Sequence, residues 1–221
     1  MIKKTEMPNR TCLGADNISK SFESRKVFSD INFELEAGEG LIITGANGSG
    51  KSTLVKILCG LLSPTSGKVS LLTDGREIPA DRRYLNYGLV SPEMKLYEEL
   101  TAEENISFFG KLHGLFLGSA DISRILDKFG LRGRGDDLLR SFSSGMKQRM
   151  KYIIATLHEP AVLFLDEPSS NLDMAGMELV DEICAKQRQD DILIVATNEK
   201  RDMKYGGMFI ELSGDSLGYT N

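Results

Sequence analysis

Eight consecutive residues at 45–52 (GANGSGKS) have the types and the spacing needed to hold a polyphosphate. They fit G-x-x-x-x-G-K-[ST] in full, with an apolar strand pattern at 41–44 before them and a helical pattern after them. Glycines let successive backbone N–H groups point at phosphate oxygens, and the positive end of the following helix faces the same anion. A glycine-rich turn that binds nothing would not need both flanking elements. The stretch therefore predicts a nucleoside triphosphate site, which kinases, GTPases, motors and transporter ATPases all contain.

Two side chains at the end of this stretch have distinct predicted tasks. Lys51 places a compact cation against the β- and γ-phosphates, and the Ser52 hydroxyl is a ligand for Mg²⁺. The predicted nucleotide contacts of the loop are Asn47, Gly48, Ser49, Gly50, Lys51, Ser52 and Thr53.

A second stretch, residues 162–167 (VLFLDE), is an apolar run that ends in two carboxylates. A buried strand ending in Asp166 would place this carboxylate beside the loop, where it holds Mg²⁺ directly or through water. Glu167 points elsewhere and is the predicted general base for an attacking water. The alternative is a core strand that ends in a solvated acidic turn, and the complete phosphate loop earlier in the chain disfavours it.

A third stretch, residues 142–149 (FSSGMKQR), is a turn of small residues that opens a helical pattern. Backbone N–H groups at such a helix start can bind an anion. An ordinary helix start explains the pattern equally well when it is taken alone.

Alternating strands and helices must position these three stretches. Periodicity predicts a helix that opens with a capping box of Thr101 and Glu104 and runs to Leu112. The other expected helices are 52–62, 121–129, 145–158 and 175–189, and the expected strands are 13–19, 27–36, 41–44, 69–72, 162–165, 192–196 and 208–212. This alternation predicts an α/β fold with a mainly parallel core sheet and a helical lobe inserted at about 98–160, within one domain spanning residues 1–221.

The composition argues against several other classes of protein. Of the 221 residues 41% are apolar, which suffices for a core, and the net charge of −5 provides no basic field to attract nucleic acid. Three scattered cysteines are expected to be free thiols in a reducing compartment, with Cys59 and Cys184 buried. His113 and His158 are isolated in the sequence, so no metal cluster is expected. Residues 1–10 lack the apolar segment of a signal peptide, and no apolar run is long enough to cross a bilayer.

Together these stretches resemble the nucleotide-binding domain of an ATP-binding-cassette (ABC) transporter, from about Leu13 to the end of the chain. Residues 45–53 match the Walker A motif of that family, and 142–146 match its signature, usually written LSGGQ. Residues 165–168 match Walker B with its catalytic Glu, and 169–173 match the D-loop. The resemblance implies a P-loop NTPase core with an N-terminal antiparallel β-subdomain.

The resemblance also implies how such a chain works. Two nucleotide-binding domains, as a homodimer or a heterodimer, close head to tail around ATP and Mg²⁺. Ser143 and the Gly145 backbone would then hold the γ-phosphate bound to the partner, and Phe22 would stack on adenine. A transmembrane permease subunit on another chain would carry the transport pathway, with this chain peripheral on the cytoplasmic face of the membrane. The stretch around 98–105 resembles compact exporter-type subunits, and for a chain of this length no added C-terminal regulatory domain is expected.

Several positions depart from the family pattern. The signature has Ser144 in place of Gly and Met146 in place of Gln. Pro92 stands where the Q-loop Gln should contact Mg²⁺, with Ser91 or Glu93 as substitutes, of which Glu93 would add a charge near the metal.

A further departure is Asn198, which stands where the family has the switch His. Its amide can donate a hydrogen bond to the γ-phosphate, but it can neither carry a positive charge nor shuttle a proton. The sequence therefore predicts intact ATP binding, with hydrolysis that is slow or dependent on partners.

Three other functions are alternatives to the transporter ATPase. A soluble ABC ATPase without a transporter, for instance in cofactor assembly, fits the same motifs. A P-loop kinase explains residues 45–52 but not the signature or the D-loop. A weakly hydrolysing nucleotide sensor is motivated by Pro92 and Asn198.

Overall fold

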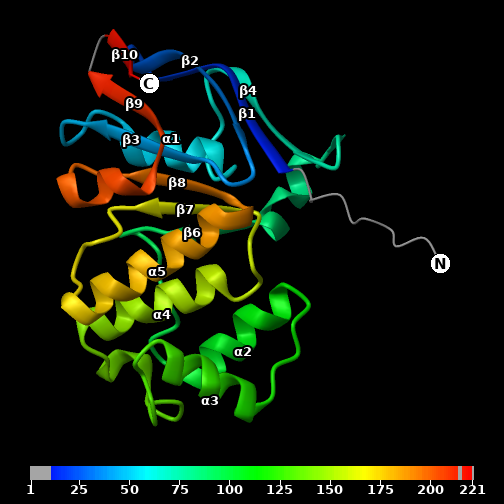
Figure 1. Ribbon diagram of the computed structural model, residues 1–221, viewed down its shortest axis with the longest axis vertical. Helices are drawn as coiled ribbons and strands as arrows, with labels where there is room; N and C mark the ends of the chain where they lie inside the picture. Colours follow the sequence, from blue (N-terminus) through cyan, green and yellow to red (C-terminus); the bar gives the residue numbers. More distant parts are fainter. Residues whose placement is uncertain (1–10, 214–215, 221) are drawn as a thin grey trace.

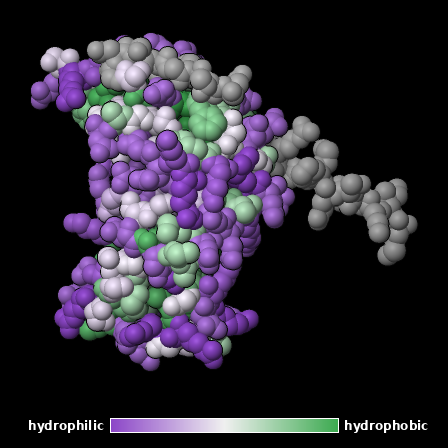
Figure 2. All heavy atoms as spheres, turned by 60° about the vertical axis from the view of Figure 1, so that its left-hand side comes forward, coloured by the Kyte–Doolittle hydropathy of each residue, from purple (hydrophilic) through white to green (hydrophobic). Residues whose placement is uncertain are grey.

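The computed structural model describes residues 11–213 and the backbone of 216–220. Residues 1–10, where no signal peptide is expected, lie outside the described residues. The molecule is built as a small antiparallel sheet, a central mainly parallel sheet and a group of helices at the opposite end (Figure 1). Figure 2 shows hydrophilic side chains in a broad band across the middle of one face, with apolar side chains above and below it.

The antiparallel sheet is formed by the N-terminal part of the chain and has the order β2-β1-β4-β5. The predicted strands 13–19, 27–36 and 69–72 all lie within it, although each real strand is longer. Asp74 and Gly75 form the predicted tight turn, with φ angles of 51° and 72°, and this turn leads into a short strand that was not predicted. The strands are β1 (Thr11–Phe22), β2 (Arg25–Glu36), β4 (Ser66–Thr73) and β5 (Arg76–Glu77).

The central sheet has the order β10-β9-β3-β8-β7-β6 and is parallel except for the hairpin of β9 and β10. The mainly parallel core sheet expected from the alternation is thus confirmed, and β10 is a strand that was not predicted. Its strands are β3 (Gly40–Gly45), β6 (Tyr87–Val90), β7 (Val162–Asp166), β8 (Ile192–Ala196), β9 (Met208–Ser213) and β10 (Ser216–Thr220).

Both faces of the central sheet are covered, and successive residues of each strand enter different cores. Leu41 and Ile43 of β3 pack toward α1 and the antiparallel sheet, whereas Ile42 packs toward the helices on the other face. The same alternation separates Phe164 from Leu163 in β7. Burying each such side chain stabilises the fold by about 1.5–3 kcal/mol. These two cores fix the carboxyl ends of the strands, which carry the candidate site.

The helix after β3 is shorter than expected: α1 covers Lys51–Leu58, whereas periodicity predicted 52–62. Gly60 adopts a φ of 81° and its N–H donates to Ile57 O, while the N–H of Leu61 donates to Lys56 O. This pair of hydrogen bonds is a Schellman motif, which ends the helix at a left-handed glycine before the proline-containing segment is reached.

The remaining helices are grouped mainly in the middle of the chain. Thr101 caps α2 as predicted, since its Oγ1 accepts from the Glu104 N–H at 3.1 Å and Glu104 Oε2 accepts from the Thr101 N–H at 2.8 Å. The predicted helix 145–158 runs over 144–156. In Figure 1, α2 and α3 lie at the end of the molecule remote from the antiparallel sheet. The α-helices are α2 (Ala102–Leu112), α3 (Ser119–Lys128), α4 (Ser144–Thr156) and α5 (Met174–Asp190), and the 3-10 helices are η1 (Ala80–Asn86), η2 (Leu139–Ser141) and η3 (Lys200–Tyr205).

The structure corrects two expectations in part, one about the two histidines and one about the burial of the cysteines. His113 and His158 are not isolated in space, because their rings stack with centroids 3.7 Å apart. All three cysteines are free, but only Cys184 is buried, while Cys12 and Cys59 are partly exposed. Among the helices of the described residues, none has the length and apolar character needed to cross a membrane.

Candidate functional site

A cavity of about 910 Å³ lies against the loop between β3 and α1. Its size is that of a pocket for a nucleotide-sized ligand. It is lined by Phe22, Ser24, Arg25, Lys26, Val27, Asn47, Gly48, Ser49, Gly50, Lys51, Ser52, Thr53 and Glu167. Every predicted contact of the phosphate loop therefore lies on the wall of one cavity.

The loop owes its shape to its glycines. Gly45, Gly48 and Gly50 have φ angles of 139°, 80° and 106°, which side chains with a Cβ rarely adopt. A Cβ on Gly50 would also meet the side chains of Val27 and Phe28. The loop reverses the chain between the end of β3 and the first turn of α1, so backbone N–H groups at the start of α1 face the cavity.

Lys51 spans its own loop. The side chain is buried, and its Nζ donates to Gly45 O at 2.8 Å and to Ala46 O at 3.3 Å. An ammonium has three hydrogens, so one remains for an anion in the cavity. The first turn of α1 contains no acidic residue, so no side chain of that turn opposes the positive field of the helix end and of Lys51.

Asp166 ends β7 beside Ser52. Burial raises the pKa of the Asp166 carboxyl, and a hydrogen bond with the Ser52 side chain and the charge of Lys51 oppose this rise. Its Oδ1 atom is buried without a hydrogen-bond partner, which is an arrangement that a cation would satisfy. Carboxylate and hydroxyl oxygens are hard ligands of the kind that Mg²⁺ binds together with phosphate oxygens. No group of three or more His, Cys, Asp or Glu side chains that could hold a metal occurs in the described part of the chain.

Glu167 follows Asp166 but points into the cavity. It has a φ of 53°, and its N–H donates to Ala196 O at 2.9 Å. This left-handed conformation is costly for a non-glycine residue and turns the side chain away from that of Asp166. The Ser170 hydroxyl lies 3.5 Å from Glu167 Oε2. The two consecutive carboxylates thus have different surroundings, one buried beside Ser52 and one facing open space.

Asn198 lies just beyond the end of β8, which is adjacent to β3. Its Nδ2 donates to Asn47 Oδ1 at 2.8 Å, so the residue at the switch position contacts the phosphate loop directly. Thr197 anchors this segment, since its N–H donates to Ile43 O at 3.0 Å.

Phe22 forms part of the cavity wall at the end of β1 and is half exposed. The Lys20 ammonium lies 4.7 Å from its ring centroid. An exposed ring beside the phosphate loop offers a stacking surface for a planar base.

The signature residues Ser143 and Gly145 do not line this cavity. Ser143 caps α4, and its Oγ accepts from the Met146 N–H at 3.2 Å, so the hydroxyl hydrogen is still available to donate. A Cβ on Gly145 would lie 3.4 Å from Asn171 O, which places the signature against the D-loop. The structure does not bring the signature and the phosphate loop of one chain together.

The segment that replaces the Q-loop Gln is held by two lysines. Lys151 Nζ donates to Ser91 O at 2.9 Å and to Pro92 O at 3.2 Å. Lys56 Nζ lies 2.8 Å from both carboxylate oxygens of Glu93 and neutralises the charge expected there. Ser91 and Glu93, but not Pro92, line a cavity of about 280 Å³ that also borders Ser52 and Asp166.

Some residues of the site were not predicted from the sequence. Ser24, Arg25, Lys26 and Val27 line the large cavity because the β1–β2 hairpin folds over it. The available signal was the basic pair Arg25 and Lys26 shortly after the aromatic Phe22, since cations suit a polyphosphate.

Known proteins resemble this chain over most of its length. Residues 28–170 match the model of the family described as ABC transporter. LnrL of Bacillus subtilis, a linearmycin resistance ATP-binding protein, is 32% identical over 190 residues, which is 84% of this chain and 60% of LnrL. SrtF of Streptococcus pyogenes, a lantibiotic transport ATP-binding protein, is 33% identical over 84% of this chain and 79% of SrtF. The chain spans only 29% of YbhF of Escherichia coli, to which it is 36% identical over 169 residues.

Solved structures share the fold. The structure of the ATP-binding subunit of an ABC transporter has a TM-score of 0.79 at 29% identity and covers 94% of this chain and 89% of that chain. The dimeric structure of a bacterial ABC transporter cassette has a TM-score of 0.80 over 95% of this chain and 99% of that chain; at 21% identity it bears on the fold alone. Because the family match covers more than half of the chain, this protein belongs to the ABC transporter family as one of its ATP-binding subunits.

Proposed function

We propose that this chain binds and hydrolyses ATP to power an ABC transporter through ATP-driven dimerisation of nucleotide-binding domains. The observation that carries the proposal is the convergence of the phosphate loop, Phe22 and Glu167 on one cavity of about 910 Å³. A polyphosphate, a base and an attacking water each have a suitable partner there.

The residues divide the work as follows. Lys51 and the N–H groups of the loop hold the β- and γ-phosphates, and Phe22 stacks on adenine. Glu167 accepts a proton from the attacking water, which its carboxylate meets from the open side of the cavity. Asn198 donates to the γ-phosphate after leaving its contact with Asn47.

Ser52 and Asp166 are the residues that would hold Mg²⁺. The unpartnered Oδ1 of Asp166 and the adjacent Ser52 hydroxyl fit such an ion, with Ser91 or Glu93 at the edge of the same region. When bound, the ion neutralises charge on the phosphates.

The dimer follows from the separation of the two half-sites. Ser143 and Gly145 lie outside the nucleotide cavity of their own chain, so in this proposal they complete the site of a second nucleotide-binding domain, identical or related. The dimeric bacterial cassette supports this arrangement by its shared fold. A transmembrane permease on another chain is the proposed partner, and the region of about 98–160 is the proposed signature lobe, which would place this chain on the cytoplasmic face of a membrane.

The decisive experiment compares the wild type with Glu167→Gln in ATP turnover and ATP affinity. Loss of a general base is expected to lower turnover by at least about 100-fold and to leave affinity within about threefold. Glu178→Gln, an exposed carboxylate of α5 outside the cavity, is the control and should match the wild type. Equal inactivity of the wild type and Glu167→Gln, even with a reconstituted partner, would contradict the role of Glu167.

A nucleotide sensor with weak hydrolysis is the second candidate, because Asn198 and Pro92 replace residues that support hydrolysis in the family. A soluble ABC ATPase without a permease is the third. Purification from membranes distinguishes the last case, since a stable complex with soluble proteins alone would count against transport.

A further inference from the structure

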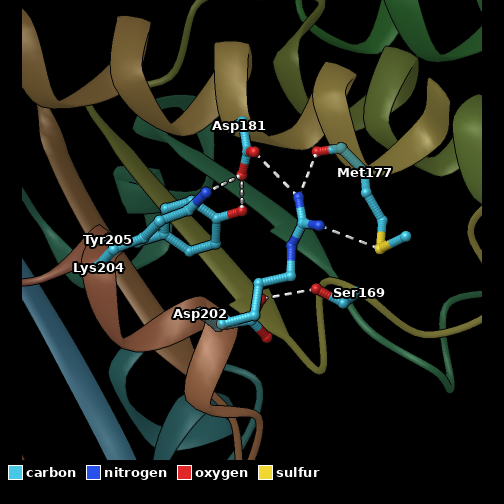
Figure 3. A network of polar contacts seen from close by, with 7 residues as sticks. Ser169, Met177, Asp181, Asp202, Lys204 and Tyr205 are labelled. Carbon is cyan, nitrogen blue, oxygen red and sulfur yellow. Dashed lines mark hydrogen bonds and ion pairs between the residues drawn. The ribbon is translucent and has the colours of Figure 1, made fainter. Parts of the chain in front are cut away.

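A buried carboxylate outside the nucleotide cavity connects two segments of the site. Asp202, on η3, has no solvent exposure. Its Oδ1 accepts a hydrogen bond from Ser169 Oγ at 2.6 Å, and its Oδ2 accepts one from Thr197 Oγ1 at 2.8 Å. Figure 3 shows the contact between Asp202 and Ser169, which come from two different segments of the chain.

These two hydroxyls flank the residues proposed to act on ATP. Ser169 follows Glu167 by two positions, and Thr197 directly precedes Asn198. Thr197 Oγ1 also accepts from the Glu199 N–H at 2.9 Å, so its own hydrogen is directed to Asp202. Each carboxylate oxygen of Asp202 therefore receives one hydroxyl, and neither segment can shift without breaking a hydrogen bond to this buried carboxylate.

A second carboxylate, Asp181 on α5, holds the outer side of the same 3-10 helix. It accepts from Arg201 at 3.0 Å and Lys204 at 2.9 Å, and from the Tyr205 hydroxyl (Figure 3). Burial opposes ionisation of Asp181, but hydrogen bonds from Lys204 and Tyr205 outweigh this effect and hold its pKa below the usual value. Arg201 donates further to Met177 O at 3.0 Å. Asp181 thus fixes η3 to α5 through contacts with η3 residues rather than with either site segment, which makes it a natural comparison for Asp202.

We propose that Asp202 is a positioning residue for ATP hydrolysis, which locks the segment after Glu167 and the segment before Asn198 into one fixed arrangement. Its side chain is fully buried and does not line the nucleotide cavity, so its effect passes through Ser169 and Thr197. Misplacement of reacting groups by about 1 Å can cost on the order of 100-fold in rate, so a tie of this kind suffices to matter. The inference rests on the proposed hydrolytic function.

The test measures kcat, KM and equilibrium ATP affinity for Asp202→Ala, beside Asp181→Asn as the matched control. For Asp202→Ala we expect kcat to fall by about 10- to 100-fold, with KM and ATP affinity within about threefold. Asp181→Asn should keep kcat within about threefold, even if its unfolding midpoint falls as much as that of Asp202→Ala. Ser169→Ala and Thr197→Val each remove one of the two hydrogen bonds to Asp202. Each should lower kcat by less than Asp202→Ala does.

A second readout does not depend on hydrolysis. Amide hydrogen exchange should accelerate at 167–171 and 197–199 in Asp202→Ala and remain unchanged there in Asp181→Asn. If wild type and Glu167→Gln turn over ATP equally, the proposed function fails, and exchange alone decides the role of Asp202. Unchanged exchange in Asp202→Ala, or an equal fall of kcat in both Asp variants, would overturn the proposal.

Discussion

The phosphate loop at 45–53 (the loop end) and the signature at 142–146 (the signature end) both lie at the start of an α-helix. The residues of one chain enclose the loop end more completely than the signature end. At the loop end, α1 begins at Lys51, and Asp166 and Glu167 from β7 arrive beside it, so one chain surrounds most of one cavity. At the signature end, α4 begins after Ser143, and the nucleotide cavity does not extend to this helix start. The loop end therefore offers a cavity within one chain, whereas in the proposed dimer the signature end is completed by a partner surface.

Both helix starts are nevertheless suited to an anion. The first turns of α1 and α4 contain no acidic residue, whereas those of α2 and α3 carry Glu103, Glu104 and Asp121. Acidic side chains in a first turn compensate the positive helix end, so α2 and α3 are poor sites for phosphate. Variants that alter only one of the two helix starts can therefore separate their roles.

The largest expected effect is on ATP affinity at the loop end. Lys51→Ala removes the buried ammonium that faces the phosphates and leaves the carbonyls of Gly45 and Ala46 without their donor. A charge-assisted contact of this kind is worth about 3 kcal/mol, so affinity should fall by about 100-fold in calorimetric titration. Lys111→Ala, at an exposed lysine of α2 outside the large cavity, should stay within about threefold of the wild type. Micromolar ATP binding by Lys51→Ala would contradict the assignment of the loop.

The next effect concerns the signature end alone. In Gly145→Asp the new carboxylate would repel the γ-phosphate of a partner, and its Cβ has room beside Asn171 O at 3.4 Å. Single-chain ATP affinity should remain within about threefold, while ATP-dependent dimers decrease by at least about tenfold. Light scattering of chains that also carry Glu167→Gln measures this change without hydrolysis. Loss of ATP affinity in the isolated chain would show that the two regions are not separable.

The sequence predicted the loop end well because its requirements are local. The three left-handed glycines and Lys51 lie within one short stretch, and the Thr101 capping box follows the same logic. The early end of α1 was missed because the Schellman motif at Gly60 competes with a helical periodicity that continues beyond it. Asp202 could not be predicted at all, since its partners are 5 and 33 residues away and meet only in the folded chain.

A smaller effect is expected at the switch position. Asn198→His supplies a group that can carry a positive charge and exchange a proton beside the γ-phosphate. Turnover should rise by about tenfold, because one charge-assisted hydrogen bond contributes roughly 1.5 kcal/mol more than a neutral one. ATP affinity should change little, since Lys51 and the loop backbone are untouched. Steady-state phosphate release is the measurement, and an unchanged or lower kcat would show that Asn198 already serves the chemistry as well as His does.

The smallest effect is on stability and lies away from both half-sites, at the stacked pair of His113 and His158. His158 Nε2 donates to Tyr87 O at 3.1 Å, and its Nδ1 is buried without a partner. Burial, and then the neighbouring His113, lower the pKa of His158 to about 4 from an ordinary value of 6.5. The folded state therefore binds fewer protons than the unfolded state, and stability is complete above about pH 6.5 and falls as the pH drops toward 4.

At pH 5 the loss should be about 1 kcal/mol, after allowance for the partial exposure of the ring. His158→Gln keeps a donor for Tyr87 O but cannot be protonated in this range, so its stability should vary less between pH 7.5 and pH 5. Urea unfolding of both proteins at the two pH values measures the difference. The ATP affinity of folded His158→Gln should equal that of the wild type, because the cavity contains neither histidine. An equal pH dependence in both proteins would show that other groups cause the loss of stability at pH 5. A fall in the ATP affinity of His158→Gln would show that the histidine pair and the loop end are coupled.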